Sequence, residues 1–234
     1  MEKVNEIRKL SIWIFILPIT VLNLCLFISV NYDLFENTIF IVDQIGRTGF
    51  TIPYIDGSVS ISRVARTYPA YLLFKPGMII TAILLIKYWY ANNTIIKKIN
   101  NESGKNRRFL IFGVLSAIFL IVHSIFLGVK FEYDLYKFFR RFVLLGFIIF
   151  EIVAQTLLVI ALFKIKNKIS QIINSKVLIL KSILVSSLVI IAFASLPIIT
   201  TSGHTLFKHA LEWNYFAAIL LFYLLTFLFW KKRP

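Results

Sequence analysis

The chain has very little cysteine and few acidic residues. Its one cysteine, Cys25, excludes a disulfide within the chain, so cysteine usage says nothing about the redox compartment. The 11 Asp and Glu are outnumbered by 26 Lys and Arg, and the formal net charge is +15. In a soluble protein such a charge would suggest a nucleic-acid partner. Here the basic residues flank apolar runs, so no nucleic-acid partner is expected.

Signatures of catalysis and of cofactor binding are also missing. The chain has no G-x-S-x-G nucleophile motif, no Walker phosphate loop and no dinucleotide fingerprint. Its three histidines, His123, His204 and His209, form no H-E-x-x-H motif, and the spacing of the last two puts them on different helix faces. We therefore expect no metal site and no cofactor. No catalytic residue is assigned, and whether the protein is an enzyme stays open.

Long apolar runs dominate what is present. Apolar residues make up 59% of the chain, and its mean hydropathy is +0.81. A bilayer core of about 30 Å needs a helix of about 20 apolar residues. Six runs have this length, at residues 10–30, 70–90, 109–129, 142–163, 177–199 and 209–230. They leave no room for a separate soluble domain, so the sequence predicts one all-α, six-helix transmembrane domain over residues 1–234.

Basic residues outside these runs predict the orientation. One side carries Lys3, Arg8, Lys9, Lys97, Lys98, Lys105, Arg107, Arg108, Lys164, Lys166, Lys168, Lys176, Lys231, Lys232 and Arg233. The other side carries the smaller set Arg47, Arg63, Arg66, Lys130, Lys137, Arg140, Arg141 and Lys208. By the positive-inside rule, both termini and the loops 92–108 and 164–176 face the cytosol. The sequons at Asn92 and Asn101 then escape glycosylation.

The opposite loops, 31–69, 131–141 and 200–208, face the lumen or the exterior in this topology. The loop 31–69 is the longest polar segment, and loops of such length are usually functional or disordered. Its aromatic and Ile content favours order. Within it, residues 58–61 alternate in polarity, which fits either a short strand or an interfacial segment.

The 70–90 run contains Pro76 and Gly77, which we expect to break the helix. Proline removes a backbone donor and frees a carbonyl that another group in the bundle must satisfy. This predicts a local opening toward the lumen. The alternative is an ordinary kink, with Lys75 extending its side chain to the membrane interface.

Ionisable residues inside the apolar runs are the main functional signal. At a rise of about 1.5 Å per residue, Lys75, His123, Glu151 and Glu212 all fall in the luminal half of the membrane. Such groups are costly there and usually functional. We predict that they converge on a polar cavity, roofed by residues 52–69, that suits a phospholipid or glycolipid headgroup. The alternative is two structural pairs without a ligand, Glu151 with His123 and Glu212 with Lys75.

Three segments resemble the Frag/DRAM/Sfk family of multi-pass membrane proteins. They are I-P-Y-I-D-G-S at 52–58, Y-P-A-Y-L-L-F-K-P-G at 68–77, and the pair Glu212 and Trp213 followed by F-Y-L-L-T-F. The family includes GPI-lipid-remodelling proteins of the post-GPI-attachment pathway and the N-terminal domain of Cwh-type ceramide remodelases. Family members often have Ser where this chain has Asp56, and a His in the second external loop, where this chain has Lys137 and its neighbours.

The resemblance implies a lipid-handling or lipid-remodelling factor of the GPI-anchor pathway, with a membrane lipid or GPI glycolipid and membrane proteins as partners. Asp56, Glu151 and Glu212 would position a headgroup or a proton, with Trp213 beside Glu212. The implied location is the endoplasmic reticulum or Golgi, with the lysosome or plasma membrane as the alternative. The tail K-K-R-P is similar to a dilysine retrieval signal, and the alternative is a plain basic stop after the last helix.

A second function stays open at this point, because some family members are non-enzymatic scaffolds or regulators of the DRAM or Sfk kind. These act in autophagy or in membrane lipid organisation. A small channel or transporter ranks below both, since no inverted repeat is detectable in the sequence.

Overall fold

The computed structural model describes residues 2–36, 38–40, 42, 45, 49–100, 108–129 and 134–231. Its long helices are α1 (Glu2–Val30), α4 (Ala70–Asn100), α5 (Arg108–Phe126), α6 (Asp134–Ile169), α7 (Ser175–Thr200) and α8 (Thr205–Phe229). Three short helices lie between α1 and α4: η1 (Tyr32–Phe35), α2 (Pro53–Asp56) and α3 (Ile61–Arg66). Each of the 6 long helices is long and apolar enough to cross a membrane. The prediction of an all-α, six-span, multi-pass membrane protein is confirmed.

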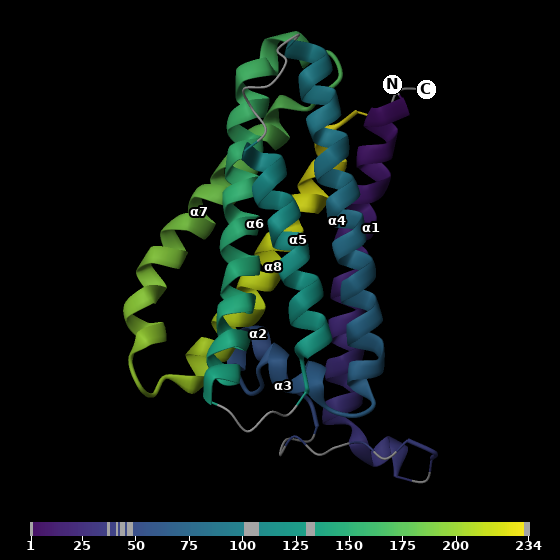
Figure 1. The fold of residues 1–234 in the computed structure, drawn as a ribbon, viewed down its shortest axis with the longest axis vertical. Coiled ribbons are helices and arrows are strands. Elements are labelled where there is room, and N and C mark those ends of the chain that lie inside the picture. The colour runs from purple at the N-terminus through teal and green to yellow at the C-terminus, as the bar shows by residue number, and fades with distance from the viewer. Residues whose placement is uncertain are drawn as a thin grey trace.

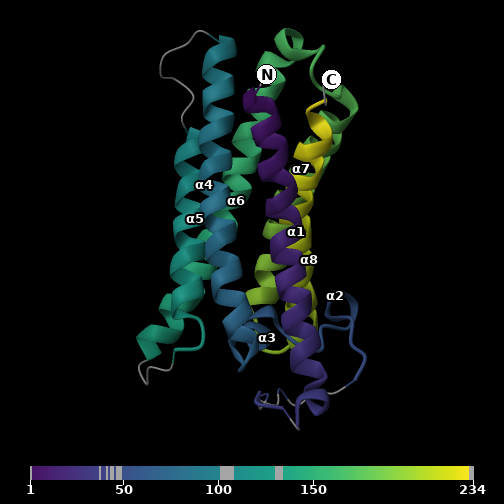
Figure 2. The same cartoon turned by 90° about the vertical axis from the view of Figure 1, so that its right-hand side faces the viewer.

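The long helices run side by side, and both termini lie at one end of the bundle (Figure 1). The Arg8 guanidinium donates a hydrogen bond to the carbonyl oxygen of Trp230, which joins the start of α1 to the end of α8. We call this the terminal end. The opposite end, which carries α2 and α3, is the loop end (Figure 2). Which end faces the cytosol stays a prediction.

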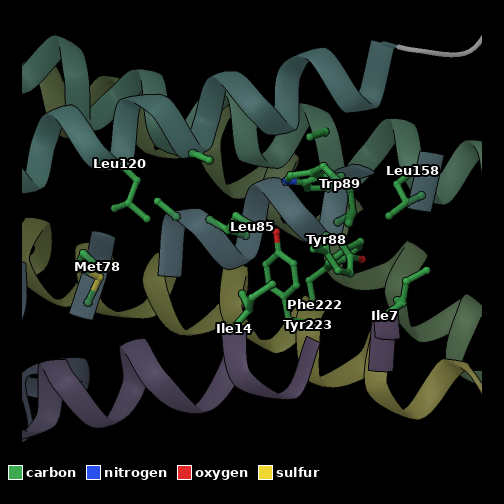
Figure 3. Packing of buried hydrophobic residues seen from close by; sticks show 14 of the residues in the cluster. Ile7, Ile14, Met78, Leu85, Tyr88, Trp89, Leu120, Leu158, Phe222 and Tyr223 are labelled. Atoms are coloured by element: carbon green, nitrogen blue, oxygen red, sulfur yellow. The ribbon is translucent and has the colours of Figure 1, made fainter. Parts of the chain in front are cut away.

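The helices form a closed ring in the order α1, α4, α5, α6, α7, α8, because each helix contacts the next and α8 returns to α1. Large buried side chains fill the middle of the ring toward the terminal end, where Tyr88, Trp89, Phe222 and Tyr223 pack together (Figure 3). Smaller residues allow the closest helix contacts. At Gly113, an added Cβ would lie 2.3 Å from the Trp89 ring.

Helix α7 is the least enclosed member of the ring. Of its most apolar stretch, 28% of the residues are buried, against 39% in α1, α4, α5 and α6. Toward the loop end, α7 leans away from α6 (Figure 1). Packing between neighbouring helices of the ring is therefore least tight between α6 and α7.

Two of the predicted loops begin later than the sequence indicated. Helix α4 continues to Asn100, beyond the predicted loop start at residue 92, because Ile95 and Ile96 extend its buried face. Asn92 is consequently a helix residue that is only 2% exposed and donates to the Tyr88 carbonyl at 2.9 Å. Asn101 lies outside the described residues. Likewise, α6 continues to Ile169, five residues past the predicted loop start at 164.

The loop 31–69 contains short helices rather than a strand, since none of its described residues pairs in a sheet. Ser60 caps α3 by accepting a hydrogen bond from the Arg63 backbone N–H at 3.2 Å, and residues 58–60 form the approach to that cap. A short polar side chain at the helix start favours this local helix over the alternating strand pattern.

The expected break at Pro76 does not interrupt α4, which runs through it as one helix. Gly77 has a different role from the one predicted. A Cβ at this position would lie 2.7 Å from Cγ2 of Val21, so the glycine permits the close approach of α4 to α1.

Candidate functional site

An internal cavity lies inside the ring, in its loop-end half. Its volume, measured for the centres of water-sized molecules, is about 80 Å³. Side chains of α1, α4, α5, α6 and α8 line it, and Ile61 and Ser62 of α3 close it toward the loop end. One water needs roughly 10–15 Å³ on this measure, so there is space for several. The acidic and imidazole side chains that line it are His123, Glu151 and Glu212, each from a different span.

Glu151 is the most enclosed acidic side chain, with 0% of its surface exposed. Its carboxylate accepts hydrogen bonds from three donors on three helices: Ser116 Oγ of α5 at 2.5 Å, Gln155 Nε2 of α6 at 3.2 Å, and the Tyr223 hydroxyl of α8. A buried carboxylate is tolerated only when it is paired in this way. Glu151 therefore ties α5, α6 and α8 together at the inner end of the cavity.

Glu212 lies next to the roof of the cavity, which it lines together with Ile61 and Ser62 of α3. Its carboxyl group is close to the backbone N–H groups of these two residues. These groups belong to the first turn of α3, where backbone donors lack partners within the helix. Glu212 is therefore a point of contact between α8 and the start of α3.

The next residues of α8 bind the segment before α3. The Trp213 indole N–H donates to the Val59 carbonyl at 2.9 Å, and its ring packs against Tyr54 with centroids 5.1 Å apart. Asn214 Nδ2 donates to the Tyr54 carbonyl at 2.7 Å. Segment 54–62 is therefore docked on α8 by hydrogen bonds from α8 side chains to its backbone and by the ring contact of its Tyr54.

Gly57 allows this docking. Its φ is +58°, and an added Cβ would lie 1.7 Å from the Leu206 carbonyl oxygen, so only glycine fits. Its own carbonyl lies 3.0 Å from Nδ1 of His209. A histidine that the sequence offered only as a weak metal ligand therefore contacts the backbone of the roof segment. The described residues hold no group of three or more side chains suited to a metal ion.

Asp56 does not line the cavity. Its carboxylate accepts from the backbone N–H of Ser58 at 2.7 Å, the backbone N–H of Ile52 at 3.0 Å and the Thr51 hydroxyl at 3.0 Å. Partial burial opposes the charged form, but the hydrogen bonds from Ser58, Ile52 and Thr51 outweigh it and lower the pKa of Asp56 from 3.8 to about 2. The side chain closes the turn over residues 51–58.

Lys75 also lies outside the cavity. Its Nζ donates to the Ile125 carbonyl oxygen at 3.3 Å and lies 5.5 Å from the centroid of the Tyr71 ring. The last carbonyls of a helix lack partners within it, and α5 ends at Phe126, so a long cationic side chain is well placed there. Within the described residues the only ion pair joins Lys3 and Glu6, so neither predicted pair, Glu151 with His123 or Glu212 with Lys75, is formed.

Lys181 was missed at the sequence level. It is 0% exposed on α7, where its Nζ donates to Thr226 Oγ1 at 2.6 Å and lies 3.8 Å from the Phe222 ring centroid. Thr226 Oγ1 is 3.2 Å from the Tyr88 hydroxyl, and the Tyr88 ring packs edge-on against Tyr223, the donor to Glu151 (Figure 3). Lys181 is the only ionisable residue of the run 177–199, and that signal would have found it.

These features define an integral, six-span membrane protein with an acidic internal cavity beneath a docked loop. No family model, curated protein or solved structure matches the chain. The resemblance of the three segments to the Frag/DRAM/Sfk family therefore stays a prediction.

Proposed function

We propose that the protein handles membrane lipids by receiving a lipid headgroup in the cavity at the loop end. The observation that carries this proposal is the convergence of His123, Glu151 and Glu212 on one cavity whose other lining is almost wholly apolar. Polar groups at membrane depth are retained where they serve a function or a partner. A few polar groups in an apolar pocket are also the usual composition of a small-molecule site.

The charge of the cavity favours headgroups that donate hydrogen bonds. Two carboxyl side chains and one imidazole line it, and neither Lys nor Arg does. Carboxyl oxygens accept hydrogen bonds from amines and hydroxyls, whereas an ionised phosphate presents acceptors to them. An ethanolamine group or a sugar therefore suits the cavity better than a bare phosphate.

The finer proposal is a lipid-handling or lipid-remodelling role in the GPI-anchor pathway, in the endoplasmic reticulum or Golgi, with the termini in the cytosol. It is supported by the resemblance and by the distribution of basic residues. Two of the segments that carry the resemblance pack against each other, since Trp213 contacts both Tyr54 and Val59. GPI glycolipids also carry the sugar hydroxyls and amines that the cavity favours.

A scaffold without lipid chemistry is the second candidate, and one observation favours it. Both acidic side chains already have protein neighbours: Glu151 accepts from three side chains, and Glu212 lies close to two backbone N–H groups of α3. If Glu151 and Glu212 serve only to hold the helices together through these contacts, the cavity needs no ligand.

Lipid retention separates the two candidates. The full chain is purified in mild detergent, and the lipids that remain bound are quantified by mass spectrometry for the wild type, His123→Gln and Lys75→Gln. We expect His123→Gln to lower retention of amine- or sugar-bearing lipids several-fold, because His123 lines the cavity. Lys75→Gln is the matched control, since Lys75 lies at the same end but outside the cavity. Equal retention by all three proteins would favour the scaffold.

The pathway needs its own test. The lipid moiety of GPI-anchored proteins is compared in cells of the source organism with and without this chain, and after its return. A change that is reversed by the wild type but not by His123→Gln is expected. An unchanged lipid moiety would refute the GPI role and leave open lipid handling of another kind.

A further inference from the structure

A second hollow lies on the outer side of the ring, between α6, α7 and α8. Its volume is about 490 Å³, measured in the same way as that of the internal cavity. Apolar side chains such as Ile149, Ile152 and Leu196 form most of its lining. The polar groups that line it, Ser195, Lys208, Glu212 and Tyr215, gather at its loop end. We call this hollow the α6–α8 groove.

The groove adjoins the internal cavity. Leu144, Ile148 and Glu212 line both. Residues of both α6 and α7 line the groove, and α7 leans away from α6 toward the loop end (Figure 1). Three side chains therefore border the groove and the cavity at once.

We propose that the α6–α8 groove binds one acyl chain of a glycerophospholipid with an amine-bearing headgroup, and that the headgroup reaches the cavity past Glu212. The inference rests on the proposed function and adds a tail site and a lateral route from the membrane. The lipid would not have to leave the bilayer to enter, because the groove opens on a face of the ring that the bilayer surrounds.

The chemistry of the groove offers a site to each part of such a lipid. Its apolar part lies deeper in the membrane, where it excludes water and favours hydrocarbon. At the loop end, the Lys208 ammonium donates to the Thr201 carbonyl at 2.5 Å and keeps two further donors, which suit a phosphate. Glu212 lies one helical turn deeper on α8, on the same side, and suits an amine. With the phosphate at Lys208, the amine would therefore turn inward past Glu212 to the cavity.

Photocrosslinking tests this site. The full chain is reconstituted in phosphatidylcholine vesicles with a trace of phosphatidylethanolamine that carries a diazirine midway along one acyl chain. After irradiation, labelled residues are mapped by mass spectrometry. We expect strong labelling of α6 and α7 residues in the groove, and weak labelling of Leu72, Leu73, Ile80 and Ile83, which are exposed on the outer face of α4.

Two matched variants on α7 sharpen the test. Ala192→Trp places a large ring in the groove, whereas Ile190→Trp places it on the outward face, where Ile190 is 66% exposed. We expect Ala192→Trp to lower labelling of the groove several-fold and Ile190→Trp to leave it unchanged. Lys208→Gln should lower labelling by phosphatidylethanolamine without closing the groove.

The possible outcomes separate the two proposals. The groove site is overturned if the groove and the α4 face are labelled equally, or if the two Trp variants have equal effects. In that case an effect of His123→Gln on lipid retention would still support the proposed function. Groove labelling that responds to Ala192→Trp, without any effect of His123→Gln on retention, supports the tail site and refutes the cavity. Crosslinks between two copies of the chain through the groove would overturn the lipid assignment.

Discussion

At the scale of single residues, three acidic side chains of the loop-end half have distinct roles that their neighbours define. Glu151 joins three helices through side-chain donors, and Glu212 of α8 lies beside the start of α3. Asp56 closes a turn outside the membrane spans. Only the first two face the cavity. Substitutions at the three positions are therefore expected to fail in different ways.

Asp56 gives a pH dependence with a defined sign. Its pKa is about 2 in the folded turn and 3.8 ordinarily, so its contribution to stability is complete above about pH 4 and is lost as the pH falls toward 2. We expect hydrogen exchange at the backbone amides of Ile52 and Ser58, corrected for intrinsic rates, to accelerate over that interval. In Asp56→Asn the same amides should exchange fast throughout. Protection in the wild type that persists below pH 2 would contradict this account of the turn.

Replacing Glu151 by Ala leaves the Ser116, Gln155 and Tyr223 donors without their acceptor. Each polar contact inside a membrane protein contributes about 0.5–2 kcal/mol, so a loss of about 2–4 kcal/mol in the free energy of unfolding is expected. Glu151→Gln keeps an acceptor oxygen and should lose less. Unfolding of the purified chain in detergent measures both. Equal stability of the Ala variant and the wild type would show that these bonds do not hold the helices together.

The positions of single side chains show what the sequence could and could not predict. Spacing along each span placed His123, Glu151 and Glu212 in the same half of the membrane, because the helical rise converts residue number into depth. It could not predict which way a long side chain extends. Lys75 extends to the end of α5 instead of the cavity, because its long, flexible side chain can donate a hydrogen bond to the Ile125 carbonyl there.

At the scale of elements, α8 is the helix on which the loop end is built. Its His209, Glu212, Trp213 and Asn214 all contact the backbone of segment 54–62. The position of the cavity's roof therefore depends on these contacts between α8 and segment 54–62. Changes in the segment should act on the cavity even where they touch none of its lining.

Gly57→Ala tests the docking. The added Cβ meets the Leu206 carbonyl, so we expect segment 54–62 to leave α8 and trypsin to cleave faster after Arg63 and Arg66. Gly49→Ala is the matched control, because its φ is also positive, at +82°, but nothing lies within 4 Å of the new Cβ. It should cost only the left-handed strain, about 1–2 kcal/mol. Equal cleavage of both variants would show that the contact with Leu206 does not hold the segment.

The spans themselves were predictable from hydropathy and length, but not their ends or the short helices. Apolar residues after position 92 extend α4 into a stretch whose polar composition resembled a loop. Residues 58–60 lead into α3 instead of forming the strand alternative, and Ser60 caps that helix. Such local features have small energies, and tertiary contacts with α8 decide them.

At the scale of the whole molecule, the ring order of the helices explains why a cavity is present at all. Aromatic side chains fill the ring toward the terminal end, and the loop-end half is left with an internal cavity and an outer groove beside α7. No sequence pattern indicated this order, because hydropathy shows which segments span a membrane but not which spans are neighbours.

The central claim is that the cavity among His123, Glu151 and Glu212 receives a lipid headgroup. Cryo-electron microscopy of the full chain in nanodiscs that contain phosphatidylethanolamine tests it most directly. The account predicts headgroup density in contact with Glu212 and continuous with an acyl chain between α6 and α7. A loop-end half that is closed and occupied by protein side chains alone would contradict it.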